Sequence, residues 1–98
     1  MDIVPCRRPE TSVNAVYDVV GPVCESGDWL GRERSLAVRA GDRLALLSAG
    51  AYGMSMASNY NTRGRPAEVM VSGNEAQLIR ERESPEQLFA NERLLPNL

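Results

Sequence analysis

Apolar positions fall in short runs along the chain, and these runs predict strands separated by turns. In residues 11–20 one side of an alternating pattern carries the polar residues Asn14 and Asp18. The other side is apolar and consists of Val13, Ala15, Tyr17 and Val19. Because successive side chains of a strand point to opposite faces, this alternation predicts a half-buried strand.

Two shorter apolar runs follow. Residues 36–38 predict a short second strand or the approach to one, and residues 43–48 have the length and apolar density of a core strand. Residues 1–10 contain two prolines, which lack the backbone N–H group of a regular ladder. We therefore expect an extended segment there rather than a paired strand.

The second half of the chain predicts a hairpin and a helix. The runs 66–71 and 76–79 flank the turn sequence of residues 72–75, which is the strongest local pattern in the chain. Ser84 then supplies a capping hydroxyl, Pro85 a first helical residue, and Gln87 the partner of a capping box. A short helix should run from there to about Arg93.

These patterns predict a mainly β fold, a small barrel or sandwich with a short helical turn after Tyr52 and a C-terminal helix. The helical turn is expected at residues 54–58, where methionine and alanine are good helix formers, and Asn59, Tyr60 and Asn61 should end it. With 98 residues we expect a single domain over residues 1–98.

The composition excludes several kinds of catalytic and binding site. All 11 basic residues are arginine, and the chain has neither lysine nor histidine. This removes a Schiff-base lysine, the commonest general base and most zinc-ligand patterns. A net charge of −2 without a basic stripe argues against nucleic acid. No apolar run approaches the roughly 18 residues of a membrane span.

Cysteine usage indicates a reducing compartment. Cys6 and Cys24 are the only two cysteines, and they show neither paired spacing nor a preceding signal-peptide pattern. We therefore expect no disulfide framework and no metal site, and we expect a cytoplasmic location.

Candidate chemistry gathers in one stretch after the first predicted strand. A thiol, two carboxylates and a hydroxyl lie close together there, on Cys24, Glu25, Ser26 and Asp28. Flanking Gly-Pro and Ser-Gly pairs interrupt helix and strand, so the stretch should be a displayed loop. The residues alone leave open a small buried hydrophobe for Cys24 and a solvated charge for Glu25.

Three motifs in order resemble the C-terminal part of the diaminopimelate decarboxylase family, and the match runs across nearly the whole chain. The motifs are Gly21-Pro22-Val23-Cys24-Glu25-Ser26-Gly27-Asp28, Ser48-Ala49-Gly50-Ala51-Tyr52-Gly53 and Ser58-Asn59-Tyr60-Asn61. Residues 65–71 and 80–83 continue the resemblance in the expected order.

The resemblance implies a lyase of lysine biosynthesis, a pyridoxal 5'-phosphate enzyme of the alanine-racemase-like fold type that decarboxylates meso-diaminopimelate to L-lysine. Such an enzyme has an N-terminal barrel holding the cofactor lysine and a C-terminal β domain, and it forms a homodimer. This chain resembles only the β domain. The resemblance therefore implies that the chain is inactive alone, and it accounts for the missing lysine.

Residue roles follow from the same resemblance. Cys24 matches the proton donor that crosses the dimer interface into the partner's active site, and a thiol is largely protonated at neutral pH, as a donor must be. Glu25 matches the glutamate whose carboxylate pairs with the distal ammonium group of the diamino acid substrate. Tyr52 matches the tyrosine that contacts both the cofactor phosphate and the substrate.

The remaining motif residues are expected to be structural. Asp28 should fix the loop by accepting backbone N–H bonds, as aspartate does in turns. Asn59, Tyr60 and Asn61 should hold their own loop. Cys6 matches nothing functional in the family, and the arginine pairs 7–8 and 63 with 65 are expected at solvated or interface positions.

Two alternatives stay open. One is the matching domain of another decarboxylase of this fold type, acting on ornithine, arginine or a carboxylated polyamine such as carboxynorspermidine. The sequence Glu25-Ser26-Gly27 and the run 58–61 favour diaminopimelate. The other is a stand-alone β interaction module without chemistry, which should have no exposed apolar face.

Overall fold

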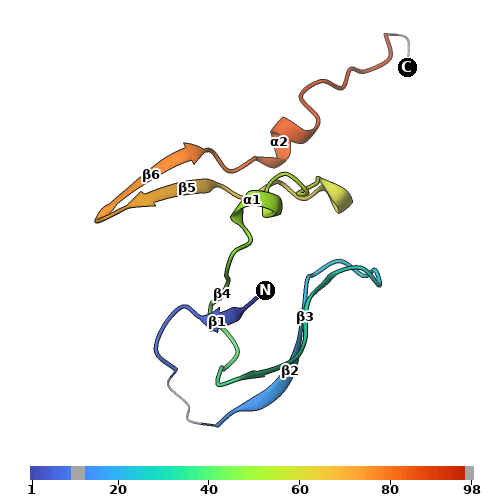
Figure 1. The fold of residues 1–98 in the computed structure, drawn as a ribbon. Coiled ribbons are helices and arrows are strands. Elements are labelled where there is room, and N and C mark those ends of the chain that lie inside the picture. The colour runs from blue at the N-terminus through green and yellow to red at the C-terminus, as the bar shows by residue number, and fades with distance from the viewer. Residues whose placement is uncertain (10–12, 97–98) are drawn as a thin grey trace. The chain divides into compact units, whose positions relative to one another are not determined.

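The computed structural model describes residues 1–9 and 13–96, which belong to two compact units, Met1–Gly53 and Met54–Leu98. Antiparallel strand pairs are the main regular secondary structure of both units, with short helical turns between and after them (Figure 1). The prediction of a mainly β chain with short helical segments is confirmed. Within the described residues the strands form three two-stranded sheets that are not joined edge to edge. No helix in the described ranges has the length and apolar character to span a membrane.

The first sheet pairs β1 (Ile3–Pro5) with β4 (Leu44–Leu46), with Ile3 opposite Leu46. The prediction that prolines keep the first residues out of a ladder is wrong. Pro5 is the last residue of β1, where its missing N–H group does not interrupt the pairing. The core strand expected at 43–48 forms as the shorter β4, whose residues are half-buried.

The second sheet pairs β2 (Ala15–Val20) with β3 (Trp29–Leu36). The strand predicted at 11–20 is confirmed over Ala15–Val20, while residues 11 and 12 lie outside the described residues. Its apolar side is less buried than predicted, since Val19 is half-buried and Tyr17 is exposed. The second strand lies earlier than 36–38, because the polar residues before Leu36 pair in a ribbon with one face in solvent.

The core of the first unit lies where β1 packs against β3. Ile3 and Leu36 are the buried apolar residues of the described chain, at 7% and 5% exposure. Gly31 is also buried, and a Cβ atom there would lie 2.7 Å from Cδ1 of Ile3. The glycine therefore allows the Ile3 side chain to cross β3 in close contact.

The helical turn of the first unit is α1 (Gly50–Gly53), so Tyr52 lies inside it rather than before it. The N–H group of Gly53 donates to the carbonyl of Ala49 at 2.6 Å. The predicted position at residues 54–58 is therefore wrong. Residues 54–56 form a turn instead, and the N–H group of Ala57 donates to the carbonyl of Met54 at 3.1 Å.

The second unit contains the predicted hairpin, formed by β5 (Glu68–Ser72) and β6 (Glu75–Arg80). Ser72 lies opposite Glu75, and Gly73 takes the positive φ of 58° that the tight turn requires. A 3-10 turn, η1 (Tyr60–Thr62), precedes the hairpin. The hairpin prediction is confirmed.

The C-terminal helix α2 (Pro85–Leu88) starts as predicted but ends earlier. The backbone N–H group of Ser84 donates to Oε1 of Gln87 at 2.7 Å, which is half of the expected capping box. The helix stops at Leu88 instead of reaching Arg93. Phe89 after it is 52% exposed, and short helices propagate only where packing supports them.

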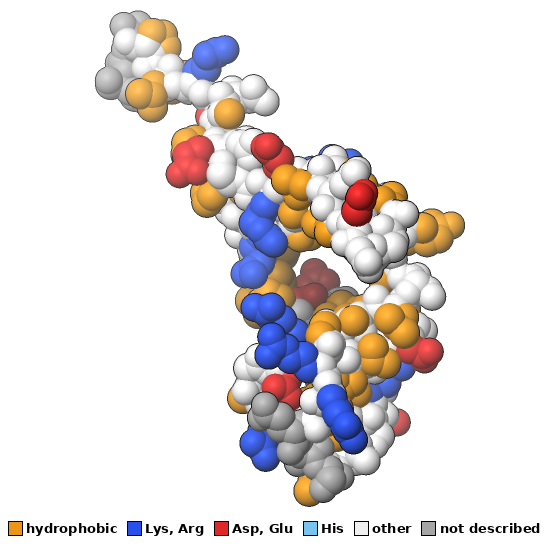
Figure 2. Space-filling model, turned by 90° about the vertical axis from the view of Figure 1, so that its left-hand side faces the viewer, with side chains coloured by type: hydrophobic (Ala, Val, Ile, Leu, Met, Phe, Trp, Pro, Cys, Tyr) orange, Lys and Arg blue, Asp and Glu red, His pale blue; other side chains and the backbone are white. Residues whose placement is uncertain are grey.

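Many apolar side chains remain exposed on both units (orange in Figure 2). On β5 three consecutive apolar residues are exposed, namely Val69, Met70 and Val71 at 54%, 56% and 66%. Because consecutive strand residues point to opposite faces, both faces of this hairpin present apolar surface. The described chain by itself thus leaves unburied the surface that usually forms a core or an interface.

Candidate functional site

The stretch that carries the candidate chemistry is the loop between β2 and β3, and Asp28 closes it. The N–H group of Gly21 donates to the carbonyl of Asp28 at 2.9 Å. The N–H group of Val23 donates to Oδ2 of the Asp28 side chain at 2.8 Å. The expectation that Asp28 fixes this loop by accepting backbone hydrogen bonds is confirmed.

Gly21 lets the Asp28 carboxylate lie against the backbone. A Cβ atom at position 21 would lie 2.1 Å from Oδ1 and 2.2 Å from Oδ2 of Asp28, far inside van der Waals contact. Any other residue at position 21 would therefore displace the carboxylate. Gly21 and Asp28 thus act together to hold the two ends of the loop close to each other.

Cys24 lies in the middle of a tight three-residue turn at the tip of the loop. The N–H group of Glu25 donates to the carbonyl of Val23 at 2.9 Å, which is the bond of a γ-turn centred on Cys24. The N–H group of Asp28 donates to the carbonyl of Glu25 at 3.3 Å. Cys24 and Glu25 are both exposed, so the predicted loop displays its thiol and carboxylate to solvent.

Glycine also makes room for the Glu25 side chain. A Cβ atom at Gly27 would lie 2.5 Å from Oε1 of Glu25, so this carboxylate folds back over the bare backbone of Gly27. The loop thus uses one glycine for its closure and a second for the placement of its acidic group.

The strands below the loop carry irregularities that sequence reasoning missed. Residue pairing shifts between Tyr17 and Val19 and again between Val19 and Val20, so β3 holds extra residues there. Oδ1 of Asp18 accepts the N–H group of Glu33 at 2.9 Å, and Glu33 has a positive φ of 51°. Such bulges often lie beside functional loops, where they change the direction of a strand. Asp18 was visible in the sequence only as a polar position of β2.

An aromatic contact lies at the start of β3. The guanidinium carbon of Arg32 lies 4.3 Å from the centroid of the Trp29 ring, in a cation–π arrangement. Trp29 pairs with Val20 across the sheet, directly below the loop. Sequence reasoning gave neither residue a role, because an arginine three positions from a tryptophan is uninformative without the strand geometry.

Tyr52 comes from a different element of the first unit, α1. Its side chain is 72% exposed, and a Cβ atom at either Gly50 or Gly53 would meet no atom within 4 Å. The structure therefore places Cys24 and Glu25 together on one loop and presents Tyr52 separately on α1.

Cys6 lies away from the loop, directly after β1. It is exposed, and it lines an open hollow together with Pro5, Arg7, Arg8 and the turn residues 41–43. Its N–H group extends the β1–β4 ladder by donating to the carbonyl of Arg43 at 2.9 Å. Both cysteines are free thiols.

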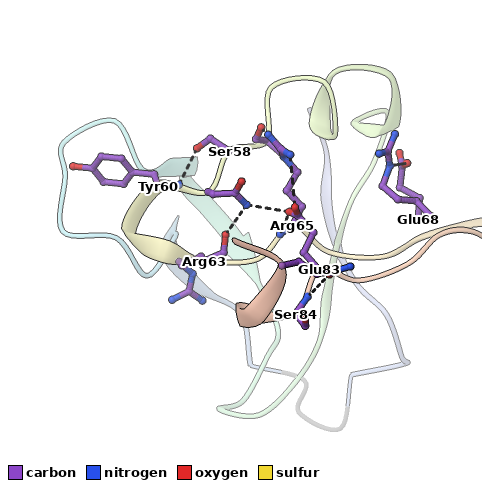
Figure 3. Close-up of polar contacts among 11 residues, drawn as sticks. Ser58, Tyr60, Arg63, Arg65, Glu68, Glu83 and Ser84 are labelled. Carbon is purple, nitrogen blue, oxygen red and sulfur yellow. Dashed lines mark hydrogen bonds and ion pairs between the residues drawn. The ribbon is translucent and has the colours of Figure 1, made fainter. Parts of the chain in front are cut away.

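The second unit contains a separate polar cluster around Glu83, shown in Figure 3. Oε1 of Glu83 accepts Nδ2 of Asn59 at 3.0 Å and the backbone N–H group of Arg65 at 2.7 Å. Asn59 also donates to the carbonyl of Arg63 at 3.0 Å. Asn59 thus holds its loop, as predicted. The role of Glu83 was missed, because its partners lie far away in the sequence.

The hydrogen bonds to Glu83 affect its titration. Donation from the Asn59 side chain, followed by donation from the Arg65 backbone, holds the pKa of the Glu83 carboxyl below its usual value, against a smaller opposing effect of desolvation. Because these donors favour the ionised form, the cluster is arranged around a carboxylate. It stabilises the segment between η1 and α2 and contains none of the predicted site residues.

The chemistry available at the loop is proton donation and cation binding. An exposed thiol can give a proton to a carbanion, and an adjacent carboxylate can pair with an ammonium group. The Tyr52 hydroxyl can donate to a phosphate group of a cofactor. Within residues 1–9 and 13–96, no cluster of three or more cysteine and acidic side chains could hold a metal ion.

Residues 2–50 match the family described as pyridoxal-dependent decarboxylase, C-terminal sheet domain. The chain is 54% identical over 96 residues to diaminopimelate decarboxylase of Pseudomonas fluorescens, covering 98% of this chain and 23% of that protein. It is 54% identical over 95 residues to the Vibrio cholerae diaminopimelate decarboxylase, covering 97% and 22%. The chain therefore spans less than a quarter of the length of these relatives.

Solved structures that resemble this chain are also diaminopimelate decarboxylases. The diaminopimelate decarboxylase of M. jannaschii, in complex with L-lysine, superposes with a TM-score of 0.89 and 44% identity, covering 99% of this chain and 22% of that one. The Helicobacter pylori enzyme complexed with L-lysine gives a TM-score of 0.81 and 37% identity, covering 92% of this chain and 22% of that one.

Proposed function

Because the chain belongs to the family of pyridoxal-dependent decarboxylases, through its C-terminal sheet domain, we propose that it contributes the loop of Cys24 and Glu25 to the active site of a diaminopimelate decarboxylase. The reaction is the loss of carbon dioxide from meso-diaminopimelate to give L-lysine. The observation that carries the proposal is the closed loop that displays a thiol and a carboxylate side by side.

Cys24 acts as the proton donor. After carbon dioxide leaves, the Sγ–H bond of Cys24 breaks, and its proton forms the new C–H bond on the carbon that lost the carboxylate. The resulting thiolate takes a proton from solvent before the next turnover. The exposure of Cys24 and its position at the centre of a tight turn support this role.

Glu25 and Tyr52 bind the reactants. The Glu25 carboxylate pairs with the distal ammonium group of the substrate and so selects a diamino acid. The Tyr52 hydroxyl donates to the cofactor phosphate and contacts the substrate. When bound, pyridoxal 5'-phosphate supplies the electron sink that makes decarboxylation possible. The exposed tyrosine fits one part of a phosphate site, whereas the lysine that would hold the cofactor is absent from this sequence.

The missing parts come from a cofactor barrel N-terminal to this region and from a second subunit of a homodimer. In this arrangement residues 1–98 act as one β domain, and their strands complete a small barrel or sandwich. The exposed apolar faces of the β5–β6 hairpin support such partners, because an isolated module would bury them. Two free thiols are consistent with a cytoplasmic enzyme.

The test uses a composite enzyme, in which this chain is joined to the part of the Pseudomonas fluorescens decarboxylase that it does not cover. We expect the composite to release carbon dioxide from meso-diaminopimelate and the 98-residue chain alone to release none. Cys24→Ala should lower kcat sharply while cofactor absorbance is retained, and Cys6→Ser should leave kcat unchanged. Equal turnover of Cys24→Ala and the parent composite would contradict the proton-donor role.

The runner-up is a decarboxylase for ornithine, arginine or a carboxylated polyamine. The relatives named above are all diaminopimelate decarboxylases, and two of the solved ones hold L-lysine, which favours the diaminopimelate reaction. Parallel assays of the composite on these substrates decide between them. A higher kcat/KM for ornithine than for meso-diaminopimelate would favour the runner-up.

A further inference from the structure

We propose that Asp28 is a positioning residue for the reaction, because it sets the direction in which Cys24 and Glu25 leave the loop. This inference rests on the proposed function of that loop. Asp28 itself need not touch the substrate. Its effect is exerted through the backbone on both sides of the thiol.

The argument starts from the two neighbours of Cys24, since both are bonded to Asp28. On the N-terminal side, Val23 donates its N–H group to the Asp28 carboxylate at 2.8 Å. On the C-terminal side, Glu25 accepts the N–H group of Asp28 at 3.3 Å through its carbonyl. The residues on both sides of Cys24 are therefore tied to Asp28.

The turn centred on Cys24 transmits this anchoring to the thiol. Because Glu25 also donates its N–H group to the carbonyl of Val23, the three residues move as one turn. A shift of the Asp28 carboxylate displaces Val23, and with it the Cα–Cβ direction of Cys24. The same shift moves the Cα atom of Glu25 and therefore the position of its side chain.

Gly21 keeps the carboxylate in place from the other side. The half-buried Asp28 side chain occupies the space that a Cβ atom at position 21 would fill. Gly21→Ala therefore offers a second way to displace the carboxylate without removing it.

The chain also contains a matched control. Asp42 accepts the N–H group of Arg39 through Oδ2 at 2.9 Å in a turn of the same unit, so it makes a similar local bond away from Cys24. The Asp42→Ala variant therefore shows how much the loss of one aspartate-to-backbone hydrogen bond in a turn changes the melting temperature and kcat.

The experiment compares Asp28→Ala, Asp28→Asn, Gly21→Ala and Asp42→Ala in the composite enzyme, in a Cys6→Ser background. The measurements are kcat, KM for meso-diaminopimelate, melting temperature, and the rate at which iodoacetamide alkylates Cys24. Since small misplacements of reacting groups cost up to about 100-fold in rate, Asp28→Ala should lower kcat about 10- to 100-fold and raise KM.

Asp28→Asn should restore most of the turnover, because an amide oxygen still accepts the Val23 N–H group. Gly21→Ala should reproduce the loss of kcat and, like Asp28→Ala, change the alkylation rate. Asp42→Ala should lower only the melting temperature. If Asp28→Ala fails to fold, the kcat and alkylation rate of Gly21→Ala decide whether Asp28 positions Cys24.

Two failures are distinguishable. If Cys24→Ala lowers kcat but Asp28→Ala and Gly21→Ala behave like Asp42→Ala, the positioning role is overturned and the proposed function stands. If Cys24→Ala has full kcat, the proposed function itself fails.

Discussion

Asn59 and Glu83 are joined by a hydrogen bond between two segments of the second unit, from Nδ2 of Asn59 to Oε1 of Glu83 at 3.0 Å. The same oxygen accepts the backbone N–H group of Arg65. One carboxylate thus connects the loop before the hairpin to the segment after it, and this connection has consequences for stability at low pH.

Stability should fall in acid partly through Glu83. Because its pKa is lowered in the folded chain, its contribution is fully present above the ordinary value of 4.5 and is lost as the pH falls through the lowered value. Thermal melts of the composite enzyme and its Glu83→Gln variant should therefore differ at neutral pH and converge in acid. Glu81→Gln is the control. A difference that grows as the pH falls would contradict the role of the ionised carboxylate.

Gly31→Ala should destabilise the first unit. The added Cβ atom would lie 2.7 Å from Cδ1 of the buried Ile3, and overpacking of this kind costs about 1–3 kcal/mol. Gly50→Ala is the matched control, since a Cβ atom there meets no neighbour within 4 Å. Melting temperatures of the two variants provide the measurement. Equal values would show that β1 does not pack over Gly31.

Gly27→Ala should weaken substrate binding more than catalysis. The new Cβ atom displaces the Glu25 carboxylate, whose Oε1 would be 2.5 Å away, while the turn around Cys24 is retained. An exposed charge pair is worth about 0.2–1 kcal/mol, so KM should rise by up to roughly fivefold with little change in kcat. A fall in kcat as large as the rise in KM would contradict separate roles for the two side chains.

The 98-residue chain on its own should self-associate through the β5–β6 hairpin. Val71 is 66% exposed within an apolar run, so Val71→Arg should shift sedimentation velocity profiles toward the monomer. Gln77→Arg, on the neighbouring strand, adds the same charge at a position that is already polar and should have little effect. Equal profiles for the two variants would exclude the hairpin as the contact.

Local patterns were predictable where a few neighbouring residues decide the structure. The hairpin turn at Gly73, the start of α2 at Ser84 and the loop closure by Asp28 all depend on residues close in sequence. The candidate residues Cys24 and Glu25 were also found from their motif, and the structure places both at the exposed tip of the predicted loop.

Features set by distant contacts were not predictable. The pairing of β1 with β4 depends on strands from opposite ends of the first unit, and the bulges of β3 depend on the Asp18 carboxylate reaching Glu33. The premature end of α2 reflects the small amount of packing around Phe89. In each case tertiary contacts, or their scarcity, override the local pattern.

The pairing of β1 with β4 also has a consequence for the order of folding. β2 and β3 are neighbours in sequence, so their hairpin can form as soon as both strands are present. This hairpin includes the closed loop that carries Cys24. The buried contact of Ile3 with Gly31 and the ladder to Leu46 close much longer stretches of chain, and long closures are slow. The loop of Cys24 should therefore acquire its shape before the core of the first unit forms.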